Sequence, residues 1–296
     1  MRSDAMTHQV VRFVSDGSLI EGDLFVPEAS RDGTPHPAVV LAQGFTVPRF
    51  LALPDYARFF AEAGFASLVI DYRGWGSSDG ERHRLIPMEQ VDDLRNAVNY
   101  LETRPDIDPA RIGLWGASFG GANVVCAAGL DDRVKAVASQ VGFGDGLQVL
   151  FDSRSPTEQR RLVEAVKRAR RARVLGEPEE TTTTVEILNS AQVAAFVEQA
   201  GAQAPDLTAK LSWRTVETML EYRPIDFVQR ISPRPILFVA SARDDICTES
   251  RIRELYERAS DPKEFVSFDV EHYDMYAGDA FLDTAGEAIR FFEQHL

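Results

Sequence analysis

Residues 116–120 read Gly116-Ala117-Ser118-Phe119-Gly120, and they stand between an apolar run and a run of small residues. The run before them, 111–115, is typical of a buried strand, and the run after them, 121–128, is typical of a closely packed helix. The sequence therefore predicts a strand that ends, and a helix that begins, around Ser118. So tight a turn requires a strained backbone at the serine, and the two outer glycines allow strand and helix to approach closely.

The G-x-S-x-G pattern is typical of a nucleophile elbow, in which a serine is exposed at the corner between strand and helix. The pattern alone is weak evidence, because a chance match is expected in roughly one chain of this length in ten. A second match lies at 76–80, but the polar residues 81–84 follow it in place of a helix. The context favours Ser118 as a nucleophile and indicates that Ser77 and Ser78 are loop residues.

The composition indicates a packed globular protein with a strong acidic excess. The chain has 296 residues and a formal net charge of -14. Phosphate backbones and anionic membranes prefer basic surfaces, so neither nucleic-acid nor membrane partners are expected. No apolar run approaches the ~20 residues that span a bilayer, and residues 1–6 lack the apolar region of a signal peptide. We therefore expect a cytoplasmic protein, in which Cys126 and Cys247 are reduced thiols.

Strand-like and helical runs alternate along most of the chain. Two strand-like runs, 10–14 and 19–26, flank the turn Asp16-Gly17 and predict an antiparallel hairpin at a sheet edge. Further strands are predicted at 37–42, 65–71, 111–115, 133–139, 235–240 and 264–269. Helices are predicted at 54–63, 91–101 and 121–128, and a closing helix at 280–292. This alternation predicts an α/β protein with a doubly wound, mostly parallel sheet.

The alternation stops between about 145 and 225, where the sequence is helical, polar and charged. We expect this stretch to be a helical lid insertion over the carboxyl ends of the strands, where such sheets bind ligands. Residues 1–144 and 226–296 then form the core. The insertion has a basic cluster, which we interpret as a solvated helix face, with contact to an anionic substrate group as the alternative. Its members are Arg160, Arg161, Lys167, Arg168, Arg170, Arg171 and Arg173.

A serine hydroxyl needs a base that accepts its proton and a carboxylate that orients this base. His272 lies just beyond the last predicted strand, where its side chain can reach the carboxyl edge of the sheet. His295 is the penultimate residue and is expected to be exposed. Asp244 and Asp245 follow the strand at 235–240, and both are candidates for the acid.

A carbonyl under attack also needs hydrogen-bond donors for its developing negative charge. The backbone N–H of Phe119 is one candidate, because it lies at a helix N-terminus where the helix dipole helps. The backbone N–H of Phe45, which follows Gly44 in the loop after the strand at 37–42, is the other. No group of histidine, cysteine and carboxylate residues has the spacing of a metal site, so no metal is expected.

These motifs together resemble the α/β-hydrolase superfamily, and they run along nearly the whole chain. They are Gln43-Gly44-Phe45, 71–78, 108–121, Asp244 and His272. The residues around Asp71 and Ser118 are similar to a bacterial branch that includes dienelactone hydrolase-like and X-Pro-peptidase-like proteins. Gln43 stands where many relatives have histidine, and Ser241 replaces a common glycine. X-Pro peptidases carry large extra domains that this chain lacks, which disfavours a dipeptidyl-peptidase activity.

The resemblance implies an α/β-hydrolase fold and a serine hydrolase without a cofactor, with its triad in the order serine, acid, histidine. That order excludes as the base the three histidines His8, His36 and His83. It favours His272 as the base, and the place of Asp244 matches the family's carboxylate better than that of Asp245. The implied reaction cleaves an ester or related acyl bond of a small organic substrate through an acyl-enzyme on Ser118. An acyltransferase, an amide or C–C bond hydrolase, and a homodimer are left open.

Overall fold

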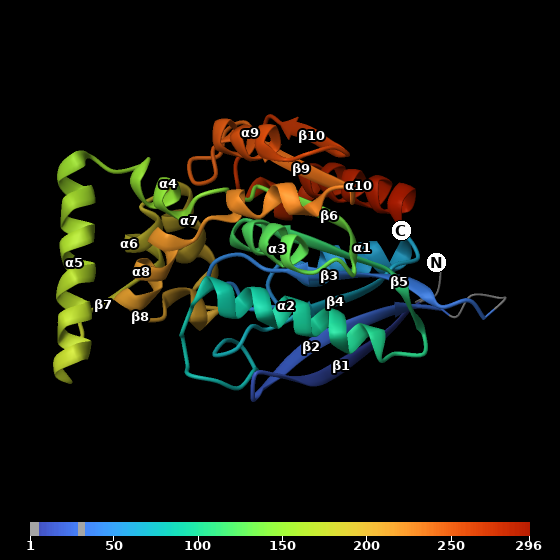
Figure 1. Ribbon diagram of the computed structural model, residues 1–296, viewed down its shortest axis with the longest axis horizontal. Coiled ribbons are helices and arrows are strands. Elements are labelled where there is room, and N and C mark those ends of the chain that lie inside the picture. Colours follow the sequence, from blue (N-terminus) through green and yellow to red (C-terminus); the bar gives the residue numbers. More distant parts are fainter. Residues whose placement is uncertain (1–5, 29–32) are drawn as a thin grey trace.

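The computed structural model describes residues 6–28 and 33–296 (Figure 1). The expectation about a signal peptide falls mostly on residues 1–5, which lie outside the described residues. The main sheet has eight strands in the order β1-β2-β4-β3-β5-β6-β9-β10. They are β1 (Met6–Ser15), β2 (Ser18–Pro27), β3 (His36–Ala42), β4 (Ala66–Ile70), β5 (Ile107–Ala117), β6 (Val134–Gln140), β9 (Ile236–Ser241) and β10 (Lys263–Phe268).

The strand pairing confirms the predicted fold class. β1 and β2 form an antiparallel hairpin, β2 pairs antiparallel with β4, and every other neighbouring pair is parallel. The hairpin lies at one edge of the sheet, with β1 outermost, as the sequence predicts. Parallel strands require crossover connections, and helices supply them here.

Helices cover both faces of the sheet, which explains why its central strands are apolar throughout. α1 (Leu53–Glu62) and α10 (Gly278–His295) pack on one face. α2 (Pro87–Glu102), α3 (Phe119–Leu130) and α9 (Glu249–Arg258) pack on the other. Within β3, Val39 and Leu41 contact the first group and Val40 contacts the second, as the alternation of side chains along a strand requires.

The turn between β5 and α3 has the strained geometry that the sequence predicts. Ser118 has φ 57° and ψ -120°, which is uncommon for a residue with a side chain. A Cβ atom on Gly120 would lie 2.0 Å from the carbonyl oxygen of Ala42, and one on Gly116 would lie 2.3 Å from that of Gly120. The absence of side chains at these two positions therefore allows α3 to start directly beside the end of β3.

Between β6 and β9 the described chain adds no strand to the main sheet. The 145–225 segment instead gathers at one end of the molecule, on the left of Figure 1. It contains α4 (Gly146–Phe151), α5 (Pro156–Leu175), α6 (Thr184–Leu188), α7 (Ala191–Ala200) and α8 (Trp213–Glu221). A short antiparallel pair, β7 (Thr181–Thr182) and β8 (Leu211–Ser212), also lies in it. The sequence does not predict this pair, because strands of two residues are too short to show an alternating pattern.

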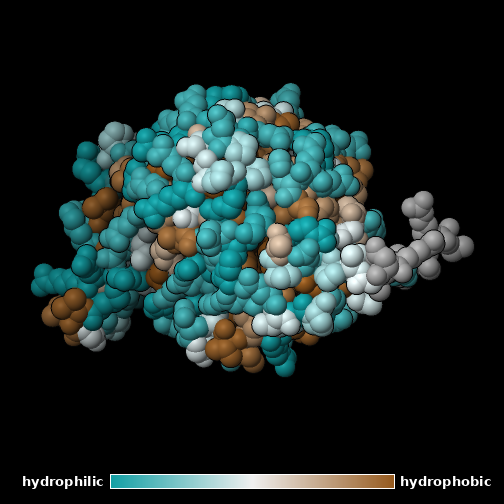
Figure 2. All heavy atoms as spheres, turned by 45° about the vertical axis from the view of Figure 1, so that its right-hand side comes forward, coloured by the Kyte–Doolittle hydropathy of each residue, from teal (hydrophilic) through white to brown (hydrophobic). Residues whose placement is uncertain are grey.

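The basic cluster of the segment lies on α5, the outermost helix in Figure 1. Six of its seven members are exposed, and the seventh, Arg173, pairs with Glu179 and Glu217. The face drawn in Figure 2 is mostly hydrophilic, with hydrophobic side chains in small separate groups. Among the helices of residues 6–28 and 33–296, none combines the length and the apolar character that a bilayer-spanning segment needs.

We expect Gly120→Ala to lower the free energy of unfolding by more than about 2 kcal/mol, because the added methyl group meets backbone that cannot move independently. Gly286→Ala is the matched control, since no atom lies within 4 Å of a Cβ at that helical position. It should raise stability by roughly 0.5–1 kcal/mol through its better helix propensity. Urea unfolding of both variants measures the difference, and equal effects of the two substitutions would contradict the packing argument.

Candidate active site

A cavity lies at the carboxyl ends of β3 and β5. Ser118 and His272 both line it, together with Gln43 from the end of β3 and Thr184 from α6. The rest of its wall is mainly apolar, and the 145–225 segment supplies a large part of it. These apolar residues include Phe45, Val47, Leu51, Leu53, Leu188, Phe196, Val197 and Leu207.

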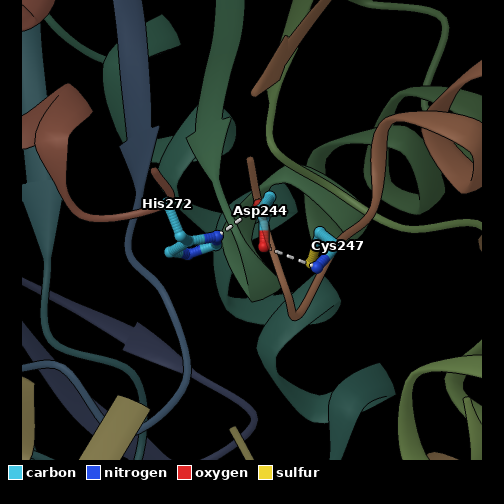
Figure 3. Close-up of side chains that lie close together, drawn as sticks. All are labelled: Asp244, Cys247 and His272. Atoms are coloured by element: carbon cyan, nitrogen blue, oxygen red, sulfur yellow. Dashed lines mark hydrogen bonds and ion pairs between the residues drawn. The ribbon is translucent and has the colours of Figure 1, made fainter. Parts of the chain in front are cut away.

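His272 and Asp244 form a buried pair beside this cavity. His272 Nδ1 lies 2.6 Å from Asp244 Oδ2, and the two residues are 1% and 6% exposed. The other carboxylate oxygen, Oδ1, accepts hydrogen bonds from the backbone N–H groups of Ile246 (2.7 Å) and Cys247 (2.9 Å). Figure 3 shows the carboxylate between the imidazole and residue 247. An ionised carboxylate can only accept, so Nδ1 carries the proton and Nε2 is left as the basic nitrogen.

The neighbouring Asp245 has a different partner. Its Oδ1 accepts a hydrogen bond of 2.6 Å from the hydroxyl of Ser190, the N-cap residue of α7. Two positions further on, the side chain of Gln192 accepts from the backbone N–H of His272 (3.1 Å) and donates to the carbonyl of Arg243 (2.9 Å). The start of α7 therefore contacts both loops that carry the His272–Asp244 pair. The sequence carries no signal for Ser190 or Gln192, because these contacts join segments that are 50 to 80 residues apart.

Cys247 is the third side chain in Figure 3. Burial raises the pKa of its thiol well above the usual value, and the charge of Asp244 adds to this effect. The nearby hydroxyl of Ser118 acts in the opposite direction, so the serine lies beside the same cluster. The thiol is therefore neutral at physiological pH, and it is a poor nucleophile in that form. Cys126 is buried and unpaired as well, as expected of reduced thiols.

The fold brings together a group that sequence spacing alone did not indicate. One donor atom each of Asp244, Cys247 and His272 lies within 4.8 Å of the other two. A metal site would require a thiolate and free lone pairs on the carboxylate and the imidazole. Here both carboxylate oxygens already accept hydrogen bonds, Nδ1 faces the carboxylate, and the thiol is neutral. These contacts favour a hydrogen-bonded cluster over a metal site.

The loop after β3 passes directly beside the serine. A Cβ atom on Gly44 would lie 3.4 Å from Cβ of Ser118, so only a small residue leaves space here for the hydroxyl and a ligand. No described group accepts a hydrogen bond from the backbone N–H of Phe45 or from that of Phe119. The rings of these two phenylalanines pack at 5.4 Å, and that of Phe119 stacks on Tyr222 at 5.9 Å. Neither N–H group is therefore engaged by the described residues.

A buried cluster of charged side chains holds the loop after β3 in place. Arg49 is 9% exposed and donates to Glu21 (2.7 Å) and Asp23 (2.9 Å) on β2. It also pairs with Asp71, whose carboxylate accepts from the backbone N–H groups of Arg49 and Ser77, each at 2.9 Å. Asp71 thus holds its own loop through a backbone contact. The role of Arg49 was not predicted, since an isolated arginine in a loop is usually solvated.

Comparisons with known proteins agree with this architecture. A curated relative, named "Uncharacterized 31.7 kDa protein in traX-finO intergenic region" of Escherichia coli, is 33% identical over 96% of this chain and 99% of its own. Thiohydrolase aneE of Aspergillus aculeatus is 27% identical, over 99% of this chain and 95% of its own. The crystal structure of the α/β hydrolase GrgF from Penicillium sp. sh18 superposes with a TM-score of 0.83 and 28% identity, over 98% of this chain and 99% of that one.

Polyketide transferase grgF of Penicillium sp. is 31% identical over 89% of this chain and 88% of its own. The model of one protein family, described as X-Pro dipeptidyl-peptidase (S15 family), matches residues 16–274. The chain has the α/β-hydrolase fold, and it belongs to the X-Pro dipeptidyl-peptidase (S15) family of enzymes.

Proposed function

We propose that this protein is a serine hydrolase that cleaves an ester or thioester through an acyl-enzyme on Ser118. The observation that carries the proposal is the buried His272–Asp244 pair, at 2.6 Å, which lies at the cavity that Ser118 also lines from its strained turn. In this assignment His272 is the general base and Asp244 orients it. Asp245 anchors α7, and the 145–225 segment acts as a lid.

The mechanism follows from the arrangement of these groups. Nε2 of His272 accepts the proton of the Ser118 hydroxyl as the oxygen attacks the carbonyl carbon of the substrate. The N–H groups of Phe45 and Phe119 stabilise the negative charge on the carbonyl oxygen, and the imidazolium then donates its proton to the leaving group. Water, activated by the same imidazole, hydrolyses the acyl-enzyme and regenerates the serine.

The wall of the cavity indicates the class of substrate. It is mainly apolar, and none of the residues that line it is an aspartate or a glutamate. A dipeptidyl peptidase binds the ammonium group of a peptide N-terminus, and a buried ammonium requires a counter-charge. The cavity therefore suits an uncharged acyl group better than an X-Pro dipeptide. The names of the relatives, a thiohydrolase and a polyketide transferase, support an acyl thioester as the substrate.

A transferase is the second candidate. The relative that is 31% identical is named a polyketide transferase, and a lid that excludes water would favour transfer of the acyl group to an alcohol or amine. Hydrolase and transferase would share Ser118, His272, Asp244 and the two N–H donors. The two candidates differ only in what attacks the acyl-enzyme.

Ser118→Ala should lower the rate of thioester hydrolysis by at least ~10³-fold and abolish labelling by a fluorophosphonate, because the acyl group then has no acceptor oxygen. Cys247→Ser is the matched control in the same cluster. It should lower the rate of thioester hydrolysis by less than about tenfold, since it replaces one neutral hydrogen-bonding group with another. Mass spectrometry of the labelled peptide locates the adduct. Labelling of Cys247 in place of Ser118 would contradict the proposal.

Asp244→Asn should lower kcat/KM by ~10³-fold or more, because an amide no longer fixes the imidazole with its proton on Nδ1. Asp245→Asn removes the same charge one residue away and should lower kcat/KM by less than about tenfold, since Asp245 contacts Ser190 and not the imidazole. Steady-state kinetics with one thioester compares the two variants directly. Similar losses in both would mean that the acid has been assigned wrongly.

If the protein is a hydrolase, an acyl thioester should yield one equivalent of free acid for each thiol released, with or without added alcohols and amines. Products are quantified by liquid chromatography after incubation with an acyl thioester and each class of acceptor. A new ester or amide that forms only with active enzyme, and that consumes most of the acyl group, would identify a transferase instead.

A further inference from the structure

Gln43 has a buried amide oxygen that accepts no hydrogen bond from any described protein group. The residue is 1% exposed and follows the last residue of β3. Its Nε2 donates a hydrogen bond of 2.6 Å to the backbone carbonyl of Ile70, at the end of β4. A carbonyl can only accept, so the orientation of the amide is fixed and Oε1 must point away from Ile70. None of the described residues donates to this Oε1.

The residue that carries this acceptor lines the cavity. Gln43 lines the cavity together with Ser118 and His272, and it directly precedes Gly44, which packs against the serine. Three other buried side-chain atoms lack a hydrogen-bond partner among the described residues. Each of them is an N–H group outside the cavity wall. They are Arg95 Nε, Trp115 Nε1 and Trp213 Nε1. Among the described residues, the oxygen of Gln43 is thus the one buried side-chain acceptor without a hydrogen bond.

A buried acceptor without a donor is unfavourable, and a ligand that supplies the donor removes this cost. The ligand group must therefore carry an O–H or N–H. Gln43 precedes the proposed oxyanion donor Phe45 by only two residues, so the donor must be close to the reacting carbonyl. The mainly apolar remainder of the wall offers few groups that could select such a ligand in another way.

We infer that Gln43 is a specificity-determining residue, whose Oε1 accepts a hydrogen bond from a hydroxyl or N–H that the acyl group carries near its scissile carbonyl. This inference rests on the proposed function and narrows its substrate class. The preferred substrates are hydroxyacyl or acylamino thioesters and esters, and plain alkanoyl chains are poorer ones. A plain chain leaves the acceptor unpaired, whereas a hydroxyacyl chain supplies a donor to it.

The test compares N-acetylcysteamine thioesters of butanoate and of the two enantiomers of 3-hydroxybutanoate. For the wild-type protein, kcat/KM for one hydroxyacyl enantiomer should exceed that for butanoyl by at least ~10-fold. Equal values for all three thioesters would overturn the inference without any variant, whereas absence of labelling at Ser118 together with no cleavage of any thioester would overturn the proposed function. The two failures are therefore distinguishable.

In Gln43→Met the new side chain has a similar shape but lacks both the acceptor and the donor. The ratio of kcat/KM for the hydroxyacyl thioester to kcat/KM for the butanoyl thioester should then fall to within about twofold of one. A substitution that damages the site in general would lower kcat/KM for both thioesters and leave the ratio of the two values unchanged. Leu188→Ala is the matched control, because it reshapes the wall of the same cavity without changing a polar group. It should alter both rates and retain the preference. A preference that survives in Gln43→Met would show that another group binds the hydroxyl, and would overturn the inference.

Discussion

The strained turn at Ser118 is the constraint on which the rest of the structure depends. With φ at 57°, the serine projects from the corner where β5 ends and α3 begins. Such a conformation persists only when its surroundings hold it, and here Gly116 and Gly120 let the helix start against the end of β3. The backbone N–H of Ser118 is also fixed by the carbonyl of Gln140 on β6, at 2.9 Å. Three parallel strands therefore determine where the hydroxyl lies.

The loops around this corner are held by buried polar contacts more than by their own conformational preferences. Arg49 connects the loop after β3 to Glu21, Asp23 and Asp71, which come from two other places in the chain. Buried ion pairs of this kind add little net stability, but breaking one leaves an uncompensated charge in the interior. The cluster therefore penalises displacement of the loop that carries the Phe45 N–H. The Asp244 carboxylate, with its two backbone donors, restrains the imidazole in a similar way.

The sequence predicts the core well because its signals are local. Apolar runs, the turn Asp16-Gly17 and the elbow glycines each act within a few residues, and the structure confirms the strands and helices that they predict. The placements of Ser190, Gln192 and Arg49 depend instead on tertiary contacts between distant segments, for which a single sequence has no pattern. The Gln43 side chain shows the same limit. Its position before Gly44 was noticed, but only the fold shows that one end of the amide is bonded and the other is not.

The hydrogen bonds at the start of α7 couple access to the cavity with alignment of the imidazole. Gln192 binds the backbone N–H of His272, and Ser190 binds the residue that follows Asp244. A displacement of α7 that moves Phe196 and Val197 off the cavity wall would strain these bonds in the same event. The imidazole would then be held less firmly whenever this part of the cavity wall is displaced.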